Sequence, residues 1–167
     1  MAYRNKTYIC FDADTDMWAY KFMKGWKNND NIDFDFYDAH DLNNLRDGSS
    51  ETTIKVKLRE RMKNSKLLLV IVGEKTKNLH RFVRWEMDVA LELDVPIVAV
   101  YLNLSKTCDT TVCPPIIRDK LVLHVPFKQV AIKWAIDNWI EERKYHKKEN
   151  HFGPIILKDS LYKEFGI

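Results

Sequence analysis

The chain has 167 residues, of which 46% are hydrophobic and 31% are charged. This balance is typical of one folded domain and argues against disorder. No apolar run reaches the roughly 20 residues that span a bilayer, and the first residues lack the layout of a signal peptide. The net charge of +3 is low for a protein that binds nucleic acid through phosphate contacts. We therefore expect a cytoplasmic protein that binds neither a membrane nor nucleic acid.

Apolar strands alternate with amphipathic helices along the chain. The predicted strands are residues 8–11, 34–37, 67–72, 96–102 and 121–125. The predicted helices are residues 17–26 and 52–64, a helix with Val83, Met87, Ala90 and Leu91 on its buried face and Asn78 as a possible cap, and residues 129–143. This alternation predicts an α/β fold, a flavodoxin-like three-layer sandwich with a five-stranded parallel sheet in the order 2-1-3-4-5.

Acidic residues follow the first predicted strand, at Asp12, Asp14 and Asp16. Ligands of open α/β sheets bind beyond the carboxyl ends of the strands, so this loop, the loop after Tyr37 and the segment after Gly73 form the expected site. One interpretation is a phosphatase of haloacid-dehalogenase type, with Asp12 as nucleophile and Asp14 as acid and base. The alternative is a solvated loop in which Asp16 caps the next helix.

The cysteines are few and odd in number: Cys10, Cys108 and Cys113. Without a secretory signal they are expected to be reduced thiols. Cys108 and Cys113 are candidate metal ligands together with His124. The four-residue gap between the two cysteines is not typical of zinc, however, and no fourth ligand is evident. The sequence therefore predicts no metal site.

Glu86 is the most informative acidic residue, because it falls within the predicted helix after the third strand. Its spacing from Val83 and Ala90 puts it at the edge of the buried helix face. A partly desolvated carboxylate is costly unless it has a partner or a task. The other interpretation is an exposed glutamate paired with Arg84 or Arg81.

Three passages together resemble a TIR domain: Leu58 to Gly73, Phe82 to Glu86, and Pro96 to Val100. More narrowly, they resemble the TIR-like proteins of the Thoeris anti-phage system, of the ThsB type. The resemblance covers Lys6 to Arg143. Its specific parts are a helix that runs through Asn-Ser into a strand, and an aromatic residue four positions before a glutamate.

The resemblance implies an NAD-consuming enzyme in which Glu86 is the catalytic residue and no metal takes part. The family usually has Trp four residues before this glutamate, and Phe82 stands there in this chain. The loops after the first and second strands supply the other walls of the site. The corresponding residues are Phe11, Asp12, Ala13, Asp38, Ala39 and His40.

The implied chemistry follows from charge. Nicotinamide leaves as a neutral group, and a fixed carboxylate stabilises the oxocarbenium-like sugar that remains. Capture by water yields ADP-ribose, and capture by a group of the same molecule yields a cyclic isomer. The Thoeris likeness implies that this product is a signal for a separate effector protein, and TIR domains often complete their sites by self-association.

Two questions stay open at the level of sequence. The anionic diphosphate of NAD needs a cation, and the candidates are Arg46, Arg81 and Arg84.

Besides the phosphatase, two other functions compete with NAD cleavage. One is a catalytically silent TIR-like interaction module, and the other is an N-glycosidase resembling nucleoside deoxyribosyltransferases, which also place a glutamate in an α/β fold.

The predicted domain spans residues 1–144, and residues 145–167 form a C-terminal extension. This extension is too apolar for a free tail, so we predict that it packs on the domain or on a neighbouring subunit. Its apolar residues are Phe152, Ile155, Ile156, Leu157, Leu161, Tyr162 and Phe165.

Overall fold

The structure, a computed structural model, describes residues 6–38, 50–79 and 81–167. Its strands are β1 (Lys6–Cys10), β2 (Tyr37–Asp38), β3 (Leu67–Val72), β4 (Ile97–Tyr101), β5 (Val122–Pro126) and β6 (Ile155–Ile156). Its helices are α1 (Met17–Asn28), α2 (Glu51–Lys63), the 3-10 helix η1 (Thr76–Asn78), α3 (Phe82–Glu92), α4 (Pro115–Arg118), α5 (Gln129–Lys148) and α6 (Asp159–Phe165).

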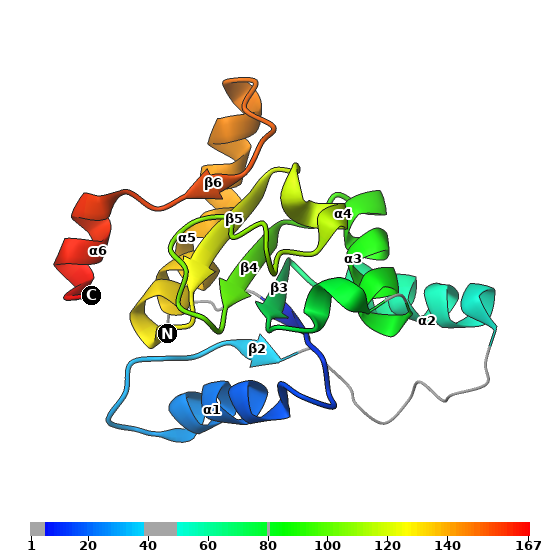
Figure 1. The fold of residues 1–167 in the computed structure, drawn as a ribbon, viewed down its shortest axis with the longest axis horizontal. Helices are drawn as coiled ribbons and strands as arrows, with labels where there is room; N and C mark the ends of the chain where they lie inside the picture. The colour runs from blue at the N-terminus through cyan, green and yellow to red at the C-terminus, as the bar shows by residue number, and fades with distance from the viewer. Residues whose placement is uncertain (1–5, 39–49, 80) are drawn as a thin grey trace.

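The described strands form one parallel sheet in the order β2-β1-β3-β4-β5-β6 (Figure 1). The predicted α/β architecture with the order 2-1-3-4-5 is therefore confirmed. The two residues of β6 add a sixth strand beside β5, which the sequence did not predict. All six residues of β3 are buried, as expected for a strand covered by helices on both faces.

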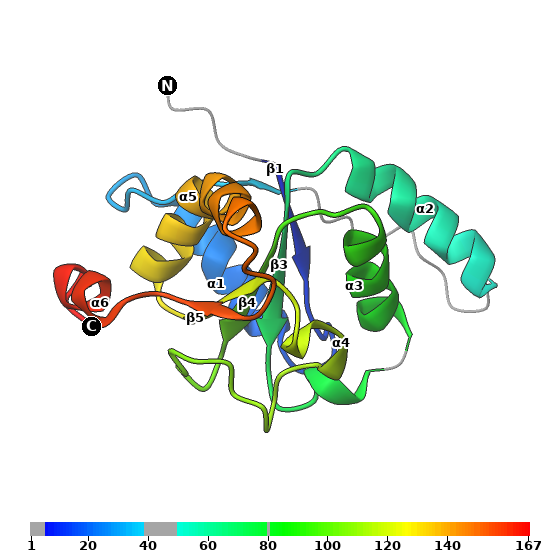
Figure 2. The ribbon, with the colours of Figure 1, turned by 90° about the horizontal axis from the view of Figure 1, so that it is seen from above.

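Helices cover both faces of the sheet (Figure 2). α1 and α5 pack on one face, and α2, α3 and α4 pack on the other. Side chains of a strand alternate between the two faces. In β1, Ile9 therefore enters the core under α1 and α5, whereas Tyr8 and Cys10 enter the core under α2 and α3.

α2 begins at Glu51, one residue before its predicted start at residue 52, and the Ser50 side chain caps it by accepting a hydrogen bond from the Thr53 backbone N–H at 3.2 Å. The start of α3 differs from the prediction that Asn78 caps this helix. Asn78 does not cap this helix, which begins at Phe82, but ends η1. The Thr76 hydroxyl accepts a hydrogen bond from the Gly73 backbone at 2.9 Å and closes a tight turn after β3.

The second strand is displaced from its predicted position at residues 34–37. Phe34 and Phe36 are buried, but neither belongs to β2. Phe34 packs edge-on against Trp26 of α1, with ring centroids 5.4 Å apart. Aromatic packing under α1, and not strand pairing, buries these two side chains.

The C-terminal residues pack on the rest of the described chain. α5 continues to Lys148, beyond the predicted boundary at residue 144. β6 then pairs with β5, and Leu157 and Tyr162 are buried in the core that includes α1 and α5.

The described residues include no helix with both the length and the apolarity that a membrane span requires.

Candidate functional site

The loop after β1 is organised by the Asp12 side chain. One carboxylate oxygen accepts a hydrogen bond from the Asp14 backbone N–H at 3.0 Å, and the other accepts one from the Thr15 hydroxyl at 2.7 Å. These bonds satisfy a carboxylate that is only 5% exposed. Both oxygens are engaged by the loop itself, which disfavours the phosphatase interpretation with Asp12 as nucleophile.

A cavity of about 640 Å³ lies between this loop and the start of α3, and we call it the β1–α3 cavity. Its volume is in the range of small-molecule sites. The lining residues are Phe11, Asp12, Ala13, Asp14, Asn78, Leu79, Arg81, Phe82 and Val83. Four residues that the resemblance implicates, Phe11, Asp12, Ala13 and Phe82, thus meet in one cavity.

The resemblance also implicates Asp38, Ala39 and His40 after the second strand. Asp38 is the last residue of β2, where it pairs with Thr7 of β1. His40 and Arg46 lie outside the described residues, as does Ala39. Their predicted roles stay predictions.

Arg81 is the candidate diphosphate ligand that lines the β1–α3 cavity, whereas the exposed Arg84 does not line it. The Arg81 guanidinium lies 5.5 Å from the ring centroid of Phe82 and 5.7 Å from that of Trp85. Cation–π contacts at this distance hold the charge at the rim of the cavity.

Glu86 is buried one helical turn beyond Phe82 and is only 4% exposed. The Tyr8 hydroxyl donates a hydrogen bond to its Oε1 at 2.8 Å. The Cys10 thiol interacts with the same carboxyl and lies 3.7 Å from the Val83 carbonyl oxygen. We call Tyr8, Cys10 and Glu86 the Glu86 cluster. The interpretation of Glu86 as an exposed partner of an arginine is therefore wrong.

Burial raises the pKa of Glu86 from its ordinary value of 4.5 to about 7, because the charged form loses its hydration. The hydrogen bonds from Cys10 and Tyr8 oppose this shift, and so does the charge of Arg61. Burial and the nearby carboxyl also raise the pKa of Tyr8, which keeps its hydroxyl protonated as a donor. Glu86 is thus poised to change its charge near neutral pH.

Glu86 does not line the β1–α3 cavity. Val83 belongs to that lining, and its carbonyl contacts Cys10, which in turn contacts Glu86. The predicted catalytic residue and the predicted binding walls are therefore neighbours through Val83 and Cys10.

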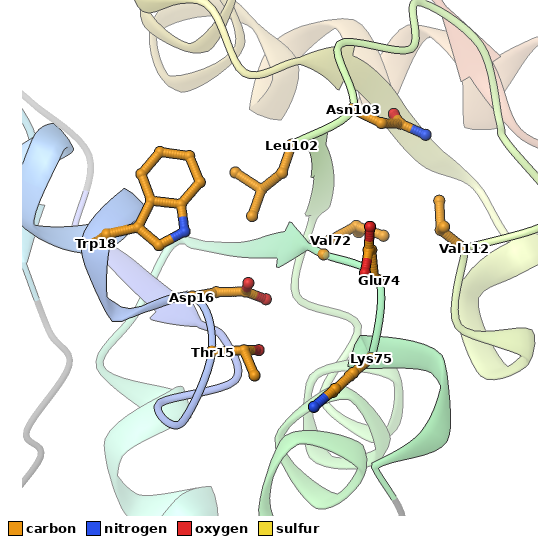
Figure 3. Close-up of a pocket in the computed structure, with 10 residues that line it drawn as sticks. Thr15, Asp16, Trp18, Val72, Glu74, Lys75, Leu102, Asn103 and Val112 are labelled. Carbon is orange, nitrogen blue, oxygen red and sulfur yellow. The ribbon is translucent and has the colours of Figure 1, made fainter.

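A second cavity, of about 350 Å³, lies beyond the ends of β3 and β4, and we call it the β3–β4 cavity. Its lining residues are Thr15, Asp16, Trp18, Val72, Gly73, Glu74, Lys75, Leu102, Asn103 and Val112 (Figure 3). Thr15 and Asp16 come from the β1–α1 loop, and Asn103 and Val112 lie across the cavity from them.

Asp16 occupies the N-cap position of α1, but its side chain makes no capping hydrogen bond. The proposed cap at Asp16 is therefore wrong. The carboxylate is 5% exposed and packs on Gly73, where an added Cβ would lie 2.3 Å from Oδ2. Burial and the neighbouring Asp12 raise the pKa of Asp16. The absence of a side chain at Gly73 is what admits this packing.

Cys108, Cys113 and His124 come together on the sheet face that α2, α3 and α4 cover. A ring nitrogen of His124 and the two sulfur atoms lie within 4.8 Å of one another. The Tyr101 hydroxyl is 2.8 Å from His124 Nδ1. Burial lowers the pKa of His124 to about 4, so the imidazole is neutral at pH 7. We call these four residues the His124 cluster; sequence spacing alone assigned no metal site to them.

Residues 8–107 match the family model described as Thoeris protein ThsB, TIR-like domain. This span begins within β1, runs through β4 and includes the β1–α1 loop and all of α3 with Glu86. The chain belongs to this family. The resemblance inferred from three short passages is confirmed, and this Thoeris TIR-like protein has the parallel α/β sheet expected of it.

Two residues that matter to the candidate site escaped sequence reasoning, Tyr8 and Tyr101. The alternation of β1 does place Tyr8 and Cys10 on one face. Which helix covers that face depends on the tertiary structure. The pairing of Ala99 with His124 brings Tyr101 near the histidine, and no local pattern reveals that register.

Proposed function

We propose that this protein cleaves NAD at the bond between nicotinamide and ribose, with Glu86 as its catalytic residue. The observation that carries the proposal is a buried carboxyl with a pKa of about 7, one helical turn from the β1–α3 cavity. A strongly perturbed carboxyl beside a cavity marks a functional candidate. Family membership supports the assignment, because it implies a TIR-like enzyme site at this helix.

The cavity supplies chemistry that suits NAD. Phe11 and Phe82 offer apolar surfaces to a flat ring, and Arg81 offers a cation to the diphosphate. Nicotinamide departs as a neutral molecule with the electrons of the broken bond. The Glu86 carboxylate then stabilises the positive charge on the sugar. Water or a group of the same nucleotide forms the new bond at the same carbon.

Access to Glu86 requires the β1–α3 cavity to extend past Val83, because the carboxyl is only 4% exposed. We propose that NAD binding or self-association opens this route. The product is then an ADP-ribose derivative, cyclic in our proposal. A separate effector protein reads it in anti-phage defence in the cytoplasm.

The decisive experiment compares nicotinamide release from NAD by the wild type and by Glu86→Gln. This change keeps the size of the side chain and removes the charge. Loss of one preorganised electrostatic group lowers the rate by roughly a hundredfold or more. NAD affinity falls less, because the charge develops mainly in the transition state.

Glu92→Gln is the matched control, since Glu92 lies on the same helix, is exposed and pairs with Arg59 at 3.0 Å. It is expected to retain the wild-type rate. Both proteins are assayed at low and high protein concentration, so that activation by self-association is included. Equal release by the wild type and Glu86→Gln removes Glu86 from the catalytic role.

The enclosure of Glu86 favours one competing function, a catalytically silent interaction module. In that case Glu86 serves only the core contact with Tyr8 and Cys10. A wild-type protein that binds partners yet releases no nicotinamide under any of these conditions would support this alternative.

A further inference from the structure

The segment between β4 and α4 holds Cys108 and Cys113 against His124 of β5. The two sulfur atoms and a ring nitrogen of His124 lie within 4.8 Å of one another. Cys113 and His124 are fully buried, and Cys108 is half-buried. All three residues lie beyond residues 8–107, the span that matches the family model.

The two thiol groups of this cluster make long contacts with backbone carbonyl oxygens. The Cys108 thiol lies 3.9 Å from the Arg118 carbonyl oxygen, and the Cys113 thiol lies 3.7 Å from the Pro114 carbonyl oxygen. Within the part of the chain that the structure describes, His124 Nε2 is buried without a hydrogen-bond partner. Buried polar atoms without partners are rare in folded proteins and call for a ligand or water.

We propose that Cys108, Cys113 and His124 bind a Zn²⁺ ion. Two thiolates and one imidazole form a known zinc ligand set, with a water in the fourth position. Bond lengths of about 2.3 Å to sulfur require sulfur atoms about 3.8 Å apart, so the side chains must close in by at most about 1 Å. Side-chain rotation supplies this movement.

Binding needs no oxidant or reductant. Two zinc–sulfur bonds form as the two thiol protons leave to solvent, and the imidazole donates a nitrogen lone pair. The half-buried Cys108 marks the side from which the ion and its water enter.

Tyr101 is the positioning residue of this site. Its hydroxyl lies 2.8 Å from His124 Nδ1 and also interacts with both cysteine side chains. Residues of this kind orient metal ligands, and their removal typically lowers metal affinity by roughly 10- to 100-fold.

The ion would fasten the segment after β4 to the sheet. Asn103 and Val112 of that segment line the β3–β4 cavity, and Val112 directly precedes Cys113. Zinc at Cys113 would therefore hold one wall of this cavity, which lies outside the proposed NAD site.

The test is performed on full-length protein, reduced under argon and stripped of metal with a chelator. Addition of Co²⁺ is expected to give one equivalent of bound metal, with the d–d bands of a tetrahedral ion and thiolate-to-cobalt charge-transfer absorption. Addition of Zn²⁺ is expected to abolish both signals and to raise the melting temperature.

Cys108→Ser is the principal variant, because its half-buried position tolerates the change, and it should weaken cobalt binding by more than about 100-fold. Tyr101→Phe should weaken it less and keep the charge-transfer bands. The control is His146→Gln with His151→Gln, which removes two neighbouring histidines 3.5 Å apart and should leave binding unchanged.

Folded, reduced wild type that takes up no cobalt overturns the proposal. So does uptake that persists unchanged in Cys108→Ser, or that is lost in the His146 and His151 control. None of these measurements depends on NAD cleavage, so a failure of the zinc proposal can be distinguished from a failure of the proposed function.

Discussion

The Glu86 cluster and the His124 cluster have similar components but differ in their hydrogen bonds. In each, a strand tyrosine reaches an ionisable side chain at 2.8 Å, Tyr8 to Glu86 and Tyr101 to His124. Cysteines lie beside both pairs, and both clusters lie on the sheet face under α2, α3 and α4. The carboxyl of Glu86 interacts with two donors, whereas Nε2 of His124 has no partner among the described residues.

The difference in hydrogen bonding suits the two clusters to different chemistries. A buried carboxylate is tolerated when hydroxyl and thiol groups donate to it. In the His124 cluster a single hydroxyl, that of Tyr101, is shared by the imidazole and the two thiols, which leaves lone pairs on these groups available for a cation. The first arrangement suits a charge that acts on a substrate, and the second suits a metal ion.

The largest expected effect concerns the Glu86 cluster and is a change in the rate of NAD cleavage with pH. In the proposed mechanism Glu86 acts as a carboxylate, and its pKa is about 7, so NAD cleavage should rise with pH through one step near pH 7. Between pH 5 and pH 8 the rate should increase by roughly a hundredfold. The measurement is nicotinamide release across this range. The residual rate of Glu86→Gln should lack this step, and a flat wild-type profile would contradict the assignment.

The stability of the folded protein should fall as the pH rises, whereas the rate of NAD cleavage should increase. Glu86 binds its proton more tightly in the folded state, so its contribution to stability is present below pH 4.5 and is lost as the pH rises to about 7. Glu86→Gln keeps the neutral form and should exceed the wild type in unfolding free energy at pH 8, on the order of 3 kcal/mol. The two proteins should be alike at pH 4. Denaturant unfolding measures the difference, which should be absent for Glu92→Gln.

A pair of tyrosine variants tests whether the clusters are separate. Tyr8→Phe removes a donor to Glu86, so the pKa of Glu86 and the midpoint of the pH–rate profile should rise. The cost in stability at pH 8 should be about 1–3 kcal/mol, because a charged group loses a hydrogen bond. Tyr101→Phe should leave the midpoint of the profile in place. A shift of equal size in both variants would show that the clusters are coupled.

The smallest effect is expected at Asp12. Asp12→Asn keeps an oxygen that can accept one loop hydrogen bond, so stability should fall by only about 0.5–1.5 kcal/mol. Measurable NAD cleavage should persist, since in the proposed mechanism Asp12 shapes the cavity and takes no part in the reaction. Thermal melting and nicotinamide release give both values. Complete loss of every activity in a folded variant would favour the phosphatase interpretation instead.

Much of the fold could be predicted because its signals are local. The apolar run of β3 and the four-residue spacing of Ile54, Leu58 and Met62 in α2 appear directly in the sequence. The start of α3 and the position of β2 could not be predicted, since the Gly73–Thr76 turn and the packing of Phe34 on α1 decide them. Short strands and helix ends depend on such contacts more than on propensity.

The features of the candidate site likewise divide into those that local sequence predicts and those that depend on tertiary contacts. Sequence determined the family, the sheet order and the position of Glu86 on α3, because these depend on periodicity and on short motifs. Only the tertiary structure decided that Glu86 is enclosed with Tyr8, and that His124 meets two cysteines distant in sequence. Burial, and with it the pKa of a carboxyl or the availability of a ligand atom, depends on which strands and helices pack together, and the order of residues along one segment does not contain that information.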